Sequence, residues 1–224
     1  MNDSGPVAQS HGGTVPAGGV FDSQTAALVR LAVAVAVGDE KLLAQRVGGA
    51  LAAETPKTWV EELLLQSILM VGYPRVLVAT GVWRQVSLPL PPAASDRMGR
   101  EDWTIAGERI CRIVYGDNYD RLRSNVAALH PTLDDWMISE GYGRVLSRPG
   151  LDLARRELCT VAQLAVLRSP RQLHSHLLGA LNAGSTPSDL HAVLEVIRDD
   201  LDPEARRVAV EMWEHCVNDQ SRPE

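Results

Sequence analysis

A glutamate and a histidine on two consecutive predicted helices have the chemistry needed for proton transfer. Glu157 shares a helix face with the apolar residues Val161 and Leu164, at spacings of four and seven. A carboxylate beside an apolar stripe is partly desolvated, which suits a group that exchanges protons near neutral pH. An ordinary ion pair with an arginine such as Arg156 would explain Glu157 equally well, and the sequence leaves both interpretations open.

His176 lies at the edge of the apolar stripe on the second of these helices. It follows Leu173 by three residues and precedes Ala180 by four. An imidazole at such a position can act as a general acid or base. A histidine at the edge of a core also commonly serves as a structural hydrogen-bonding group, and this alternative stays open. His174 points to a different face and is the weaker candidate.

Arginines are concentrated around this pair, although the whole chain has a formal net charge of −6. Arg148 and Arg156 are candidates to bind the carboxylate of a small molecule, because guanidinium groups hold carboxylates with planar geometry. Structural ion pairs on a solvated helix face are the competing interpretation. Tyr142 is a candidate to line a pocket with Tyr115 and Tyr119, and helix packing explains these tyrosines equally well.

Several function classes lack support in the sequence. The three cysteines, Cys111, Cys159 and Cys216, have no CxxC or metal-ligand spacing, so we expect neither a metal site nor a disulfide framework. Cys159 fits a helix interior and is predicted to be a small buried hydrophobe. No phosphate-binding loop is present, and no cofactor is expected. The acidic charge argues against nucleic acid or a membrane surface as partner, and the chain is predicted to be cytoplasmic.

The apolar spacing predicts an all-α fold, including the alternating stretch at residues 34–37. Four helices are predicted to begin at capping residues, which are Asp152, Ser169, Thr186 and Asp202. Gln172 completes a capping-box pattern with Ser169. Gly184 fits a left-handed position at a helix end.

The chain is predicted to contain two related helical units. Residues 1–22 are expected to be a disordered tail, residues 23–86 a degenerate N-terminal repeat, residues 87–102 a proline-rich linker, and residues 103–224 the C-terminal repeat. Leu28–Leu51 aligns with Leu158–Leu181 in apolar phase, and Thr55-Pro56 then aligns with Thr186-Pro187. A duplicated unit is the simplest explanation of this agreement.

The second unit resembles the carboxymuconolactone decarboxylase family, which includes the alkylhydroperoxidase D-like proteins. The resemblance covers roughly residues 130–200 and rests on the motifs Tyr142-Gly143, Arg148-Pro149-Gly150-Leu151, Arg156-Glu157-Leu158, His176 and Gly179-Ala180-Leu181-Asn182-Ala183-Gly184. It implies an alkylhydroperoxidase D-like helical fold that assembles into rings. The first unit resembles the same pattern more weakly.

The resemblance implies that Glu157 and His176 occupy the glutamate and histidine positions of the peroxidase branch. The two cysteine positions of that branch are Ser169 and Gln172 here, so thiol peroxidase activity is not expected. The decarboxylase branch also lacks these cysteines. We therefore expect a carbon–carbon lyase that acts on a small carboxylated lactone or related acid. In this hypothesis His176 donates the proton, Glu157 tunes it, and Arg148 or Arg156 holds the carboxylate.

The first unit lacks both candidate residues, because Ala27 aligns with Glu157 and Arg46 with His176. We expect it to act as a packing partner, so that the chain mimics a dimer of single units and three chains complete a homo-oligomeric ring. The alternative function is a non-catalytic binding or assembly protein on the same scaffold.

Overall fold

The computed structural model describes residues 19–92 and 94–220, and no strand occurs in these ranges. The prediction of an all-α fold is confirmed. Most of the tail predicted at residues 1–22 lies outside the described residues. The first helices are α1 (Ser23–Val37), α2 (Glu40–Ala52), α3 (Lys57–Gln66) and α4 (Ile68–Arg84).

In the described residues the chain then continues through short 3-10 turns, seven α-helices and one π-helix. The 3-10 turns are η1 (Ala94–Arg97), η2 (Gly116–Asn118) and η4 (Arg198–Asp200). The α-helices are α5 (Arg100–Tyr115), α6 (Tyr119–Leu129), α7 (Pro131–Trp136), α8 (Leu153–Val166), α9 (Pro170–Asn182), α10 (Pro187–Ile197) and α11 (Pro203–Gln220). Between α7 and α8 lies a π-helix, η3 (Met137–Leu146).

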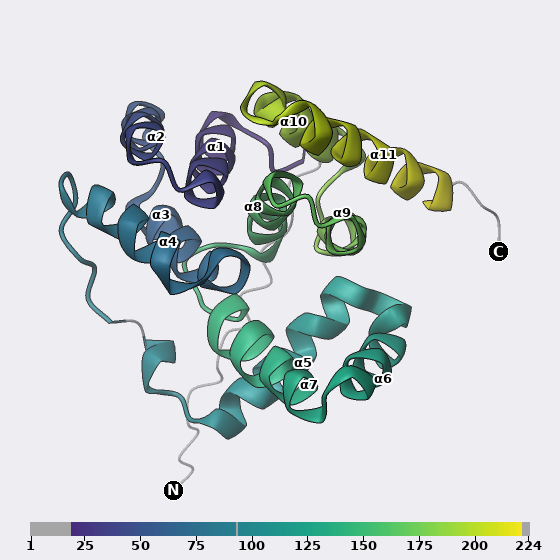
Figure 1. The fold of residues 1–224 in the computed structure, drawn as a ribbon. Helices are drawn as coiled ribbons and strands as arrows, with labels where there is room; N and C mark the ends of the chain where they lie inside the picture. The colour runs from purple at the N-terminus through teal and green to yellow at the C-terminus, as the bar shows by residue number, and fades with distance from the viewer. Residues whose placement is uncertain (1–18, 93, 221–224) are drawn as a thin grey trace, which may run out of the picture.

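The larger part of the molecule is built around α1 and α8, which lie side by side at its centre (Figure 1). Residues 31–36 of α1 are all buried. A helix that is apolar on every side is stable in water only when other helices enclose it. Here α2, α3, α4, α9, α10 and α11 supply that enclosure and share one hydrophobic core with α1 and α8. The alternating stretch at residues 34–37 is helical, as predicted.

A smaller layer made of α5, α6, α7 and η3 lies beneath α9 (Figure 1). It has its own hydrophobic core, formed by Ile110, Cys111, Val114, Tyr119, Ile138, Tyr142 and Leu146. Two glycines allow the backbones of α5 and η3 to touch. A Cβ atom on Gly107 would lie 2.0 Å from the carbonyl oxygen of Ile138, and one on Gly143 would lie 2.0 Å from that of Trp103. Because any side chain there would clash with backbone, glycine is required at this crossing.

The helix starts around the candidate residues follow the predicted capping signals, with one exception. Asp152 accepts a hydrogen bond from the Arg155 amide, and Thr186 forms a capping box with Asp189. Asp202 caps α11 through the Ala205 amide. Ser169 is the N-cap of α9, but its side chain makes no capping hydrogen bond within the described residues, so the predicted capping box is wrong. Pro170 at the first helical position starts α9 without it.

Gly184 follows α9 with a φ of 100°, the left-handed conformation predicted for this position. In the described part of the chain, no single helix is long and apolar enough to cross a membrane. The α3 and α4 helices pass that test of length and composition only as a pair, and they are bent by 114° relative to each other.

Candidate active site

Glu157 and His176 form a buried hydrogen-bonded pair between α8 and α9. The Nδ1 atom of His176 lies 2.7 Å from Oε2 of Glu157. Glu157 is fully buried, and His176 is 8% exposed. The sequence identified both residues but not their contact. Of the two interpretations of Glu157, pairing with Arg156 is not observed, because its partner is the histidine.

The pair has the geometry of a proton-transfer group. A carboxylate beside Nδ1 favours a proton on that nitrogen, which leaves Nε2 as the atom able to exchange a proton with a ligand. The second carboxylate oxygen, Oε1 of Glu157, is buried and has no hydrogen-bond partner among the described residues. This oxygen is therefore able to accept a further hydrogen bond.

Gly179 allows α9 to approach close enough for this contact. A Cβ atom at this position would lie 2.6 Å from Cγ1 of Val114 and 3.0 Å from Oε2 of Glu157. Both distances are shorter than ordinary van der Waals contact, so α9, α8 and α5 meet at the site only because residue 179 lacks a side chain.

Two tyrosines from the smaller layer border the pair. The Tyr115 ring packs edge-on against His176, with centroids 6.5 Å apart, and edge-on against Tyr142, with centroids 6.2 Å apart. Burial raises the pKa of Tyr115 to about 12, although a hydrogen bond with Tyr142 opposes the shift. Burial also raises the pKa of Tyr142, and the charge of Glu157 adds to the effect. Both phenols are therefore neutral near pH 7.

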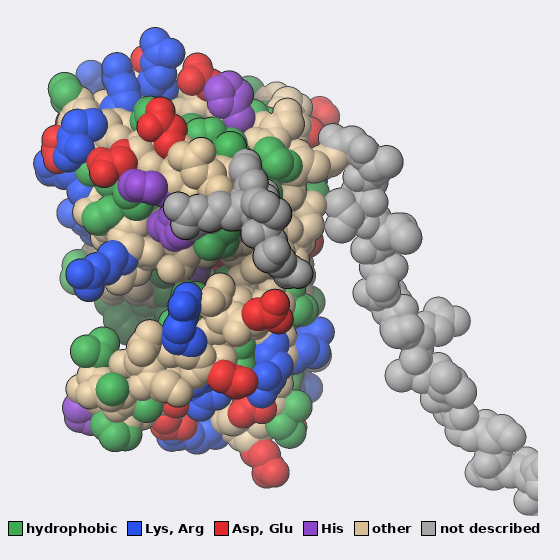
Figure 2. All heavy atoms as spheres, turned by 90° about the vertical axis from the view of Figure 1, so that its right-hand side faces the viewer, with side chains coloured by type: hydrophobic (Ala, Val, Ile, Leu, Met, Phe, Trp, Pro, Cys, Tyr) green, Lys and Arg blue, Asp and Glu red, His purple; other side chains and the backbone are tan. Residues whose placement is uncertain are grey.

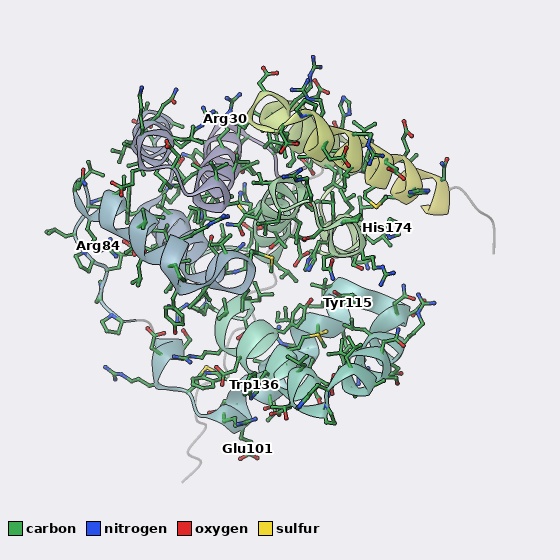
Figure 3. The ribbon with its side chains drawn as sticks, viewed as in Figure 1. Arg30, Arg84, Glu101, Tyr115, Trp136 and His174 are labelled. Atoms are coloured by element: carbon green, nitrogen blue, oxygen red, sulfur yellow. The ribbon has the colours of Figure 1, made fainter. Side chains whose placement is uncertain are left out.

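Tyr115 also lines a cavity of about 390 Å³. We call it the α5–α9 cavity. Its wall is formed by Val114, Tyr115, Asn118, Arg121, Leu122, Asn125, His174, Ser175, Leu178 and Asn182. Figure 2 shows the surface hollowed where the smaller layer meets the larger part of the molecule. Figure 3 shows His174 above this boundary and Tyr115 below it.

Arg148 and Arg156 bind carboxylates of the protein itself. Arg156 is fully buried, and its guanidinium donates to Glu62 at 2.7 Å and to the side-chain oxygen of Gln66 at 3.1 Å. Burial lowers the pKa of Arg156, and Glu62 opposes that shift. Arg148 donates to Glu62 at 3.1 Å and also pairs with Asp96. This network joins α8 to α3.

The remaining sequence candidates lie in other surroundings, and Arg148 lines the two grooves beside α3 and α4. Arg148, Arg156 and Tyr142 are absent from the described wall of the α5–α9 cavity, whereas Tyr115 is part of it. Tyr119 is buried beneath the guanidinium of Arg112. Sequence reasoning did not identify Arg121, Asn118 or Asn125, because no local motif distinguishes them from an ordinary polar helix surface, and it noted Asn182 only within the family motif.

The cysteines of α5 and α8 are buried, and their thiols are held in the protonated form. Cys159 is fully buried as predicted, and burial raises the pKa of its thiol to about 12, which disfavours the reactive thiolate. Burial likewise raises the pKa of Cys111 to about 12. Residues 19–92 and 94–220 contain no group of three or more His, Cys, Asp or Glu side chains that could hold a metal ion.

Comparison with known protein families gives a match to the C-terminal part of the chain. Residues 131–215 match the sequence model of the carboxymuconolactone decarboxylase family. The match contains both members of the buried pair and all of the motif residues on which the resemblance rests. No curated protein matches the chain significantly.

Proposed function

We propose that this chain, whose residues 131–215 match the sequence model of the carboxymuconolactone decarboxylase family, is a lyase that acts on a small carboxylated lactone or a related acid. The observation that supports this most directly is the 2.7 Å contact between His176 and the buried Glu157, next to a cavity of suitable size for a small molecule. Such an arrangement is what an enzyme needs to deliver one proton to a bound substrate.

In the proposed reaction the substrate loses its carboxylate as carbon dioxide. The electron pair of the broken carbon–carbon bond moves into the neighbouring unsaturated system and shifts its double bond. His176 then donates the proton that forms the new carbon–hydrogen bond, and water returns a proton to the imidazole. Glu157 fixes the ring orientation and stabilises its cationic form, as carboxylates do beside catalytic histidines.

Ultraviolet-monitored decarboxylation of carboxymuconolactone tests this proposal. We expect His176→Asn to lower kcat by about 10²-fold or more, because Asn cannot transfer the proton. His191→Asn is the matched control, since His191 is exposed on α10 and lies outside the cavity wall. Equal rates for His176→Asn and the wild type would contradict the assigned role.

The second candidate is a ring-forming binding or assembly protein. An apolar groove supports self-association, because Leu65, Leu69, Tyr73 and Leu77 line it and are all exposed along α3 and α4. Exposed apolar side chains gathered in one groove are typical of protein interfaces. We propose that a second copy of this chain covers this face and that three chains form a ring.

Light scattering measures the proposed assembly directly. A mass of three chains is expected, and a mass of one chain would rule the ring out. A trimer that turns over neither carboxymuconolactone nor related acids would favour the non-catalytic candidate.

A further inference from the structure

We propose that the α5–α9 cavity binds a small organic carboxylate and that Arg121 is the residue that pairs with its charge. The inference rests on the proposed function only in taking this ligand to be the substrate of His176. Neither the family domain nor the sequence motifs point to Arg121, which lies on α6 outside residues 131–215.

The charge of the cavity wall is the first argument. The protein has a formal net charge of −6, yet no aspartate or glutamate among the described residues lines this cavity. The two grooves beside α3 and α4 differ, because Asp96 and Arg148 line both of them and form an ion pair. An anion entering the α5–α9 cavity would therefore meet a cation without displacing a carboxylate of residues 19–92 or 94–220.

The partners of Arg121 are the second argument. Its guanidinium donates to the side-chain oxygen of Asn118 at 2.7 Å, and it pairs with no carboxylate in the described ranges. Arg123, two residues later on the same helix, is instead held by Asp134 through two hydrogen bonds of 2.5 and 2.8 Å. A guanidinium presents five donors, so Arg121 can still bind a ligand carboxylate through two parallel hydrogen bonds.

The rest of the wall specifies a ligand larger than an inorganic ion. Val114, Leu122 and Leu178 supply apolar surface for a carbon skeleton. Asn182 is fixed in place because its amide nitrogen donates to the Val114 carbonyl at 2.9 Å. Its side-chain oxygen, together with the Asn125 amide, can serve hydroxyl or carbonyl groups of a ligand.

Tyr115 connects the cavity to the buried pair. It forms part of the cavity wall and packs edge-on against the His176 ring. Ser175 and Leu178, on either side of His176 in the sequence, also line the cavity. A ligand anchored at Arg121 would thus have its carbon skeleton held against a wall that includes Tyr115, whose ring contacts His176. At about 390 Å³ the cavity falls at the lower end of the range for small-molecule sites.

Binding measurements test the inference without requiring turnover. The probes are benzoate and benzamide, which share a shape and differ in charge, and their dissociation constants are measured by ligand-observed NMR. We expect benzoate to bind the wild-type protein more tightly than benzamide. Arg121→Gln should weaken benzoate binding about tenfold, which corresponds to the loss of one charge-assisted contact. It should leave benzamide binding unchanged.

Arg109→Gln is the matched control, because Arg109 is an exposed arginine on α5 outside the cavity wall. This variant should bind benzoate like the wild type. Equal benzoate affinity in Arg121→Gln and wild type would overturn the inference, as would equal affinities of the wild type for benzoate and benzamide. Inorganic phosphate binding as tightly as benzoate would overturn the assignment of an organic ligand.

His176→Asn separates this inference from the proposed function. The variant should lose decarboxylation and keep the preference for benzoate over benzamide, because Arg121 supplies the charge pairing. Selective benzoate binding through Arg121 in a protein without decarboxylase activity would support the site and contradict the lyase. Decarboxylase activity that is unchanged in Arg121→Gln would support the lyase and contradict the site.

Discussion

The helix pairs α1–α2 and α8–α9 have the same plan but different chemistry. Each member of the second pair begins 130 residues after its counterpart, at residues 23 and 153 and at residues 40 and 170. The aligned core positions are buried in both pairs, which are Leu28 and Leu158, Leu43 and Leu173, Val47 and Leu177, and Ala50 and Ala180. This agreement supports our proposal that the chain contains a duplicated unit.

The polar positions show what distinguishes the two pairs. Where the second pair has Glu157 and His176, the first has Ala27 and Arg46, and Arg46 forms an ion pair with Asp200 of η4. Gly179 is covered by Val114 of the smaller layer, whereas a Cβ atom on the aligned Gly49 would meet no described atom within 4 Å. The buried polar pair thus occurs where a second layer covers the helices. The two helix pairs share their apolar packing, and the polar pair is present only in the helix pair that the smaller layer covers.

The largest expected loss of stability comes from breaking the ion pair between Glu62 of α3 and Arg156 of α8. Glu62→Ala removes the carboxylate that Arg156 and Arg148 share and leaves a fully buried guanidinium without its partner. We expect the free energy of unfolding to fall by about 3–5 kcal/mol. Chemical denaturation measures this loss.

Glu61→Ala is the control for this prediction. Glu61 lies next in sequence, pairs with Arg84 at a partly exposed position and accepts a hydrogen bond from Nε1 of Trp83, so its removal should cost about 1–2 kcal/mol. Equal losses for the two variants would show that the network on α8 contributes no special stability.

The two aligned glycines should respond in opposite directions to alanine. Gly179→Ala places a methyl group against Val114 and Glu157 and should destabilise the protein by about 1–3 kcal/mol. Gly49→Ala has open space and gains helix propensity, so it should stabilise by up to about 1 kcal/mol. Thermal unfolding of both variants provides the comparison, and a stabilising Gly179→Ala would contradict the close approach of α9.

Arg46 should matter for stability and not for catalysis. Arg46→Gln removes the contact with Asp200, which is about one-eighth exposed, and should cost about 1 kcal/mol. Its decarboxylation rate should equal that of the wild type, in contrast to His176→Asn at the aligned position. A rate loss as large as that of His176→Asn would mean that both pairs take part in the reaction.

The smallest expected effect is that of Cys159→Val. The aligned residue of the first pair is Val29, and both positions are fully buried. We expect stability to change by less than about 1.5 kcal/mol and activity to be retained. Because burial raises the Cys159 pKa to about 12, a thiol reagent at pH 8 should label this residue only after unfolding. Rapid labelling of Cys159 in the folded protein would support the hypothesis that this cysteine is a reactive thiol.

The sequence predicted those features of the fold that depend on residues close together in the chain. The helices, their starts at Asp152 and Thr186, and the end of α9 at Gly184 follow from capping and backbone preferences that act within a few residues. Glu157 and His176 were identified because they lie on the apolar faces of two consecutive helices. The failure of the Ser169 capping box shows that a matching pattern does not guarantee the hydrogen bond.

What depended on distant parts of the chain was not predicted. Arg156 was expected to be available to a ligand, but Glu62 reaches it from 94 positions earlier in the sequence. The cavity wall combines α5 and α6 with α9, and nothing around Arg121 or Asn182 indicates that they face a common space. The close approach of the α5 and η3 backbones at Gly107 and Gly143 was likewise not predicted from the sequence, because only the folded chain brings these residues together.

The separate core of the smaller layer has a consequence for how the molecule opens. Because α5 and η3 are locked together at their glycine crossing, they are expected to detach from α9 as one unit rather than fray individually. Amide protons of both helices should then exchange with solvent at a common rate, faster than those of α1 and α8. The same opening would expose His176 fully to bulk water. The rate at which this layer opens would therefore limit the time for which the buried pair can hold a proton without exchanging it with the solvent.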